Sequence, residues 1–164
     1  MLHCGSFSKC LAPGYRLGWA APGRFAQAVA RQKLTTTLGA SAPVQAALAD
    51  YLQRGGFDKH LRRLRQTLAA RQARVAEAVA AHFPPGTRAT QPAGGYFLWV
   101  ELPEGADTLR LHRQALQHGI SIAPGPIFSA SRGFAHCLRL NYGQEWNARS
   151  EAALAMLGQL AHAL

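Results

Sequence analysis

A long apolar periodicity between Phe57 and Phe83 is the feature that most restricts how this sequence can fold. Apolar residues recur there three, four or seven positions apart, as one face of a long amphipathic helix requires; they are Phe57, Leu61, Leu64, Leu68, Val75, Val79 and Phe83. The next three residues, Pro84-Pro85-Gly86, cannot continue a helix. The sequence therefore predicts a long connecting helix over 57–83, with a domain boundary directly after it.

Shorter patterns lie on both sides of this helix. Before it, a loop containing glycine and serine leads to an expected strand, which is followed by two helices; their ranges are 16–21, 22–34 and 42–53. After it, short strands and helices alternate as in a small α+β domain, with strands at 87–91, 96–102, 120–123 and 136–142, and helices at 108–117 and from about 145. We expect an α/β fold in three parts, residues 1–56, 57–83 and 84–164.

Composition narrows the class of protein. With 164 residues, of which 48% are hydrophobic and 16% charged, the chain is typical of a globular protein and not of a disordered one. No apolar stretch approaches the roughly 18 residues of a membrane helix, and the first residues lack a signal peptide, so we expect a cytoplasmic protein without membrane contact. The three cysteines form no CxxC pair and the seven histidines show no metal-binding spacing, which predicts reduced thiols and no metal site.

Basic residues outnumber acidic ones by 18 to 8, which gives a net charge of +10 and favours anionic partners. Many bases lie on or near the long helix, opposite its apolar stripe: Arg54, Lys59, Arg62, Arg63, Arg65, Arg71 and Arg74. We interpret them as a solvated helix face, with a nucleic-acid-binding module as the alternative from a different functional class. The tryptophans Trp19, Trp99 and Trp146 are expected in the core.

A segment near the N-terminus combines Lys9 with the hydroxyls of Ser6 and Ser8 and the guanidinium of Arg16. A lysine held among apolar residues near a cation can act as a neutral amine that attacks an aldehyde and forms an imine. The two hydroxyls and the guanidinium could together bind a phosphate. A surface lysine on a glycine-rich turn explains the same residues equally well.

Near the C-terminus, strand alternation over 136–142 places Arg139 on the face opposite Leu138 and Leu140. A guanidinium that points away from the core could bind the α-carboxylate of an amino acid through paired hydrogen bonds, and so orient its α-hydrogen. By spacing alone, a polar residue on a half-exposed strand is the more frequent explanation.

The segment from Ser6 to Trp19 resembles the lysine segment of fold-type I pyridoxal-phosphate enzymes, the class I/II aminotransferases. Within them it has particular similarity to the aminotransferase-like domain of MocR-type regulators of the GntR family, and to aminoadipate-type aminotransferases. The resemblance continues at residues 57–65, which match the start of the family's connecting helix, at 92–103, which match a small-domain strand, and at 119–128. It covers essentially the whole chain.

This resemblance implies a cofactor, pyridoxal 5'-phosphate, and roles for five residues. Lys9 would form the imine with the cofactor and act as the catalytic residue, while Ser6, Ser8 and Arg16 would contact the cofactor phosphate. Arg139 would bind the substrate carboxylate, because Arg-Leu-Asn-Tyr resembles the family's segment for that role. The substrates would be an α-amino acid and a 2-oxo acid, and the complete protein would be a homodimer.

The position of Lys9 implies that this is the C-terminal part of the family's fold. In the family the lysine follows most of the large domain, so residues 1–56 would be a remnant of that domain, 57–83 its connecting helix and 84–164 the small α+β domain. The partners of the cofactor ring would lie upstream, and no acidic residue precedes Asp50. We expect an aminotransferase, or a fragment of one, that is inactive alone. The alternative is the effector domain of a MocR/GntR-type regulator that binds pyridoxal phosphate and contacts DNA through a winged-helix domain absent from this chain.

Overall fold

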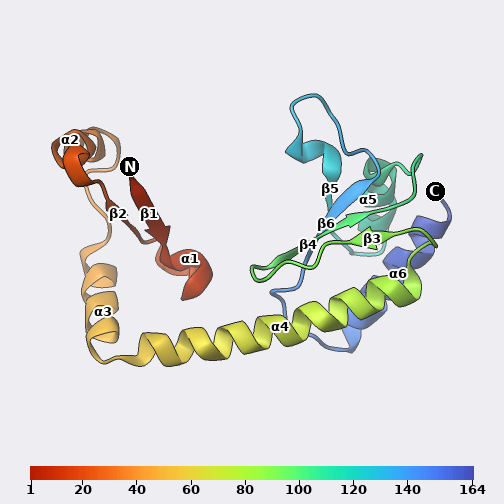
Figure 1. The fold of residues 1–164 in the computed structure, drawn as a ribbon, viewed down its shortest axis with the longest axis horizontal. Coiled ribbons are helices and arrows are strands. Elements are labelled where there is room, and N and C mark those ends of the chain that lie inside the picture. The colour runs from red at the N-terminus through yellow and green to blue at the C-terminus, as the bar shows by residue number, and fades with distance from the viewer. The chain divides into compact units, whose positions relative to one another are not determined.

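The computed structural model describes residues 1–164 and contains two compact units, Met1–Leu64 and Arg65–Leu164. Both units mix helices with a small antiparallel sheet (Figure 1). None of the helices is both long enough and apolar enough to cross a membrane.

Unit 1, Met1–Leu64, begins with two paired strands, β1 (His3–Ser6) and β2 (Gly18–Ala21). The chain between and after them forms short helices and two longer ones: α1 (Phe7–Cys10), the 3₁₀ helices η1 (Pro13–Tyr15) and η2 (Gly23–Phe25), α2 (Ala26–Thr36) and α3 (Ala42–Gln53). The helix expected at 42–53 is confirmed as α3. The strand expected at 16–21 is present as β2 but starts two residues later, because Arg16 ends the 3₁₀ helix η1. Strand β1 was not predicted, because His-Cys-Gly-Ser lacks the β-branched and aromatic residues that mark strands.

Unit 1 contains very little buried surface. Leu48 is its one buried residue, and large apolar side chains on several elements are exposed: Met1, Leu2, Tyr15, Trp19, Phe25, Leu34, Leu38 and Leu52. The expectation that Trp19 belongs to the core is therefore wrong. Its ring is 44% exposed and meets the ring of His3 edge-on, at 4.9 Å between centroids. A two-stranded ribbon offers too little area to cover an indole.

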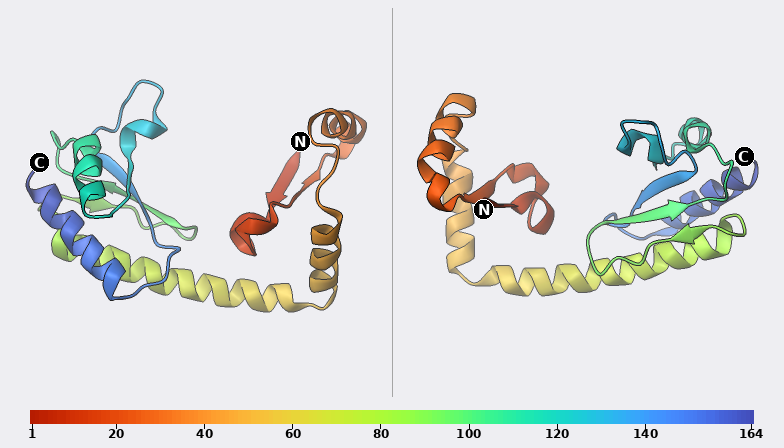
Figure 2. Two further views of the ribbon diagram at one scale, coloured as in Figure 1. Left: turned by 180° about the vertical axis from the view of Figure 1, so that it is seen from behind. Right: turned by 45° about the horizontal axis from the view of Figure 1, so that its top comes forward.

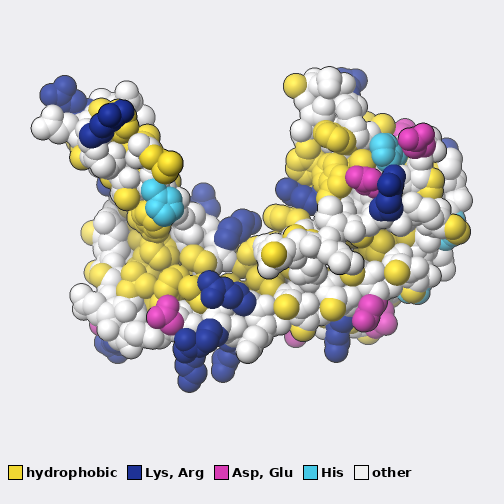
Figure 3. Space-filling view, in the orientation of Figure 1, with side chains coloured by type: hydrophobic (Ala, Val, Ile, Leu, Met, Phe, Trp, Pro, Cys, Tyr) yellow, Lys and Arg dark blue, Asp and Glu magenta, His cyan; other side chains and the backbone are white.

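The long helix α4 (Gly56–His82) confirms the expected helix to within one residue at each end. Val75, Ala78 and Val79 are buried, whereas the basic side chains on its first half are exposed and gather over that half in Figure 3. The division between the two compact units falls inside this helix, between Leu64 and Arg65. The domain boundaries expected at 57 and 84 stay a prediction.

Unit 2, Arg65–Leu164, is built on a four-stranded antiparallel sheet with the strand order β3-β4-β6-β5. Its strands are β3 (Arg88–Ala89), β4 (Phe97–Glu101), β5 (Ala123–Pro124) and β6 (Cys137–Asn141), and its other elements are α5 (Thr108–Gln117), the 3₁₀ helix η3 (Gly125–Phe128) and α6 (Ala148–His162). Strand β5 starts later than expected, because the Ile120 amide donates to the Ala115 carbonyl at 2.9 Å and so closes the end of α5.

One face of this sheet forms the core. Leu98 and Val100 of β4 stand opposite Leu140 and Leu138 of β6, and all four belong to one buried cluster with residues of the three helices, among them Val79 of α4, Leu111 of α5 and Leu157 of α6. In Figure 2, the helices of unit 2 lie next to its sheet. Trp146 packs against this cluster, as predicted, while Trp99 is half-buried on the other sheet face. Arg139 shares that other face.

Candidate active site

The lysine segment joins β1 to α1. Ser6 ends the strand and caps the helix, because its hydroxyl accepts a hydrogen bond from the Ser8 amide at 3.2 Å. Lys9 lies in the last turn of this short helix and is exposed. The apolar residues that precede and follow it, Phe7 and Leu11, are only half-buried, since unit 1 has little core to bury them.

The β1–β2 pairing brings Arg16 next to the serines. The Phe7 amide donates to the Leu17 carbonyl at 3.0 Å, directly beyond the Ser6–Gly18 pair of the ribbon. The Arg16 guanidinium then donates to the Ser8 hydroxyl at 3.3 Å. Its backbone has φ = 48°, in the left-handed region that residues other than glycine rarely adopt. Two hydrogen bonds thus connect Ser6, Ser8 and Arg16, the three residues expected to bind a phosphate.

Two residues in the first turns of α4 contact the lysine segment. A ring nitrogen of His60 lies 3.0 Å from the Cys10 carbonyl oxygen, and the ring of Phe57 meets the ring of Phe7 at 6.1 Å between centroids, tilted by 68°. Neither contact was predicted from the sequence. A histidine and a phenylalanine fifty positions away carry no local signal that they brace the lysine segment.

The chemistry of this cluster fits the phosphate of pyridoxal phosphate. Hydroxyl and guanidinium groups donate hydrogen bonds to a phosphate dianion, and the guanidinium adds a positive charge. No acidic side chain occurs in the first 49 residues to oppose that charge. Lys9 follows Ser8 directly in α1, the short helix that Ser6 caps.

The second candidate group is Arg139, in the middle of β6 within unit 2. It stands opposite Trp99 of β4 on one side and Ala123 of β5 on the other, and it is half-buried. Leu138 and Leu140, its neighbours in the strand, are buried on the opposite face, as the alternation predicts. The guanidinium carbon lies over the ring of Phe97 at 4.1 Å from its centroid, and over the ring of Phe128 at 4.7 Å.

A cavity of about 210 Å³ opens beside Arg139, and its walls include Phe97, Ser121 and Asn141. The wall of this cavity combines one cationic group with apolar and hydroxyl groups, and such a wall suits a small molecule that carries a carboxylate. Lys9 and Arg139 belong to different units. No group of three or more His, Cys, Asp or Glu side chains is placed to hold a metal ion.

Comparisons with known proteins agree on one fold. No protein-family model matches the chain. A crystal structure of LysN, the α-aminoadipate aminotransferase of Thermus thermophilus, complexed with N-(5'-phosphopyridoxyl)-L-leucine, superposes with a TM-score of 0.89 and 30% identity, over 99% of this chain and 42% of that one. The chain has the C-terminal part of the fold-type I aminotransferase fold. The resemblance found in the sequence is thereby confirmed.

Relatives with this aminotransferase-like sequence include regulators as well as enzymes. The uncharacterized HTH-type transcriptional regulator YdcR of Escherichia coli is 46% identical over 160 residues, which are 98% of this chain and 34% of that protein. The aromatic-amino-acid aminotransferase 1 of Thermococcus litoralis is 34% identical over 143 residues, 87% of this chain and 34% of that enzyme. The chain therefore spans about a third of the length of the curated relatives that it matches.

Proposed function

We propose that this chain supplies the cofactor-binding lysine and the carboxylate-binding arginine of a pyridoxal-phosphate-dependent aminotransferase that acts on an α-amino acid. The observation that carries the proposal is the hydrogen bond from Arg16 to Ser8, which holds two of the proposed phosphate-binding residues together next to Lys9 in sequence. An anion anchored there would hold an aldehyde close to one particular amine out of the three lysines of the chain.

Each residue would have a separate task. Arg16, Ser6 and Ser8 bind the cofactor phosphate and fix its position. Lys9 would hold the cofactor through its amine and would move the proton at the substrate α-carbon. The bound cofactor supplies the electron sink that makes this proton acidic enough to transfer. The ring of the cofactor would be held by residues from outside this chain.

Arg139 would bind the α-carboxylate of the amino acid and of the 2-oxo acid formed from it. A planar guanidinium offers two parallel N–H donors to a carboxylate, so it fixes the orientation of the substrate as well as its position. The half-buried setting of Arg139 strengthens this pairing relative to the same pair in open water.

We propose that the complete protein is a homodimer.

A second function is favoured by a specific observation: YdcR, at 46% identity, and YjiR of Escherichia coli, at 36%, both carry names of HTH-type transcriptional regulators. In that case the same residues would bind pyridoxal phosphate and an amine without turnover, and DNA would be contacted through another domain. Production of a 2-oxo acid by the complete, cofactor-loaded protein favours the enzyme. Sequence-preferring DNA binding that changes with pyridoxal phosphate favours the regulator.

Borohydride trapping tests the cofactor assignment on this chain. The chain is mixed with pyridoxal phosphate and reduced, and the modified lysines are mapped by mass spectrometry. We expect weak but selective labelling of Lys9 over Lys33 and Lys59, which are also exposed and serve as internal controls. Labelling spread evenly over the three lysines would contradict the assignment.

The same reaction with pyridoxal, which has no phosphate, separates the phosphate contacts from the lysine. Arg16→Ala should reduce labelling of Lys9 by pyridoxal phosphate and leave its labelling by pyridoxal unchanged. Arg24→Ala is the matched control, since Arg24 is exposed in the same unit and stacks on Phe25. Equal losses with both aldehydes would mean that Arg16 acts on the fold and not on the phosphate.

A further inference from the structure

Aromatic rings surround Arg139 on the open face of the unit 2 sheet. Its guanidinium carbon lies over the face of Phe97, at 4.1 Å from the ring centroid, and over the face of Phe128, at 4.7 Å. Cationic groups are attracted to the faces of aromatic rings within about 6 Å of the centroid. Both rings therefore hold the charged end of this side chain.

The fold explains how two residues thirty-one positions apart reach the same guanidinium. Trp99 stands directly opposite Arg139 in the β4–β6 ladder, so Phe97, two residues earlier in β4, projects from the same sheet face. Phe128 is the last residue of η3, which follows β5 on the other side of β6. Trp99 meets the ring of Phe128 edge-on, at 5.6 Å between centroids, and so braces it against the sheet.

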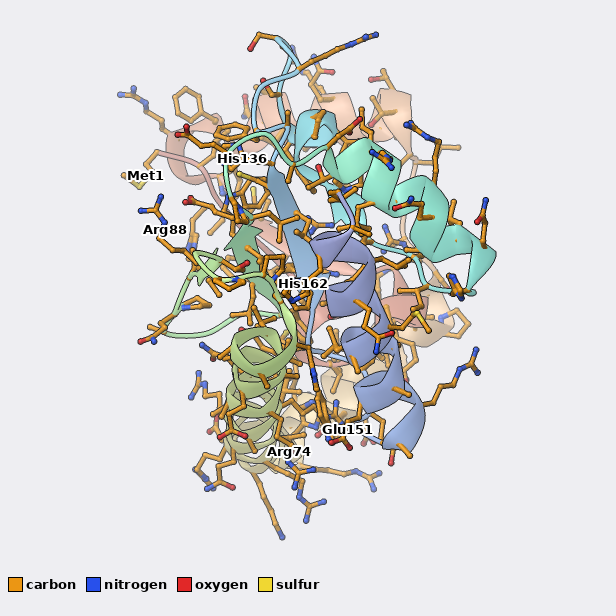
Figure 4. All side chains as sticks on the ribbon, turned by 90° about the vertical axis from the view of Figure 1, so that its right-hand side faces the viewer. Met1, Arg74, Arg88, His136, Glu151 and His162 are labelled. Carbon is orange, nitrogen blue, oxygen red and sulfur yellow. The ribbon has the colours of Figure 1, made fainter.

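The carboxylate that could compete for Arg139 is paired elsewhere. Glu101 shares the sheet face of Phe97 and Trp99 along β4, and it forms an ion pair with Arg88 at 3.7 Å. Arg88 belongs to the edge strand β3 and lies at the outer edge of the sheet (Figure 4). Arg139 has ring contacts and no acidic partner, so its N–H groups remain available for a carboxylate that enters the adjoining cavity.

We infer that Phe97 and Phe128 are positioning residues, which hold the Arg139 guanidinium in the orientation that binds the substrate carboxylate. This inference rests on the proposed role of Arg139. A free arginine side chain loses much rotamer freedom when it binds a carboxylate through two hydrogen bonds. A guanidinium already held by ring faces loses less. Arg139 also lines the adjoining cavity, so a ligand there can reach its N–H donors.

The first test detects the contact between Arg139 and the two rings in this chain, without any cofactor. Protons on the Arg139 side chain that lie over aromatic faces should resonate upfield of those of other arginines in NMR spectra. F97L and F128L should each move these resonances toward the ordinary range. F134L is the matched control, because Phe134 meets Trp99 edge-on at 5.6 Å and is not one of the two rings beneath the Arg139 guanidinium. An unchanged shift in both F97L and F128L would overturn the inference.

The second test measures amino-acid binding by the complete, cofactor-loaded protein. F97L and F128L should each weaken the binding of an α-amino acid by about tenfold, the size expected for loss of a partly desolvated cation–π contact. In a protein that turns over, KM should rise while kcat changes by less than about threefold, because the contact acts on binding. An amine that lacks the carboxylate should bind F128L and the unmodified protein equally well, because Phe128 is not among the residues that line the cavity.

Two further variants make the outcome decisive. F97Y keeps a ring face beneath the guanidinium and should retain most of the affinity, whereas a general packing defect would affect the amine and the amino acid alike. Arg139→Ala separates the two proposals. If it leaves amino-acid affinity unchanged, the proposed role of Arg139 fails. If it weakens binding while F97L and F128L do not, or while F134L weakens binding as much as they do, the positioning role alone is overturned.

Discussion

Leu138→Ala should remove much of the stability of unit 2. Leu138 is fully buried, and it stands between Val100 of β4 and Pro124 of β5 in the middle of the sheet. Replacing it by alanine removes the transfer free energy of its buried methylene and methyl groups and leaves a cavity in a site that rigid strands border on two sides. We expect the free energy of unfolding to fall by about 3 to 4 kcal/mol.

Urea unfolding followed by tryptophan fluorescence measures this loss. A Trp19→Phe background confines the signal to Trp99 and Trp146, which both belong to unit 2. Leu116→Ala on α5 is the matched control, since the same atoms are removed from a side chain that is 51% exposed; its effect should stay within about 0.5 kcal/mol. A loss below about 1 kcal/mol for Leu138→Ala, or equal losses for both variants, would show that burial of Leu138 does not stabilise unit 2 in this way.

Two other measurements probe the unequal burial of the chain. Tyr142→Phe should be as stable as the unmodified chain at neutral pH or slightly more stable, because the buried Tyr142 hydroxyl has no hydrogen-bond partner. Burial raises the pKa of Tyr142 above its ordinary value of 10.0, so the neutral phenol stabilises the fold below that pH and this contribution is lost as pH rises further. Urea unfolding at neutral pH and above pH ~10 should therefore show a smaller alkaline loss in Tyr142→Phe. In hydrogen exchange, the β1 and β2 amides should exchange much faster than those of β4 and β6, because Leu48 is the one buried residue of unit 1; equal protection would contradict this.

The elements that sequence predicted well are those with local signals. The spacing of apolar residues and the Pro84-Pro85-Gly86 break located α4 to within one residue, and α5 was predicted with its observed bounds. Strand β1 and the exposure of Trp19 were missed, because both depend on what surrounds a segment and not on its own residues. A two-stranded ribbon with one buried leucine behind it cannot cover an indole, whatever the residue type suggests.

In the candidate site, too, features with a local sequence signal were predicted and long-range contacts were not. Alternation along β6 was sufficient to place Arg139 opposite the core, and the resemblance singled out the turn that carries Lys9. The contacts that orient these groups come from distant positions: Phe128 contacts Arg139 from η3, and His60 contacts Cys10 from α4. Contacts between residues far apart in sequence depend on the whole fold, so no local sequence pattern predicts them.

At position 16, the backbone conformation favours glycine, whereas the proposed function requires arginine. With φ = 48°, the position would suit glycine, and a side chain there costs about 1 kcal/mol or more relative to the right-handed region. Under the proposed function, only the guanidinium supplies a positive charge to the phosphate. Selection of variants for thermal resistance alone would tend to replace this arginine with glycine, whereas selection for cofactor retention would keep it. Laboratory evolution of this sequence under the two regimes should therefore diverge at position 16.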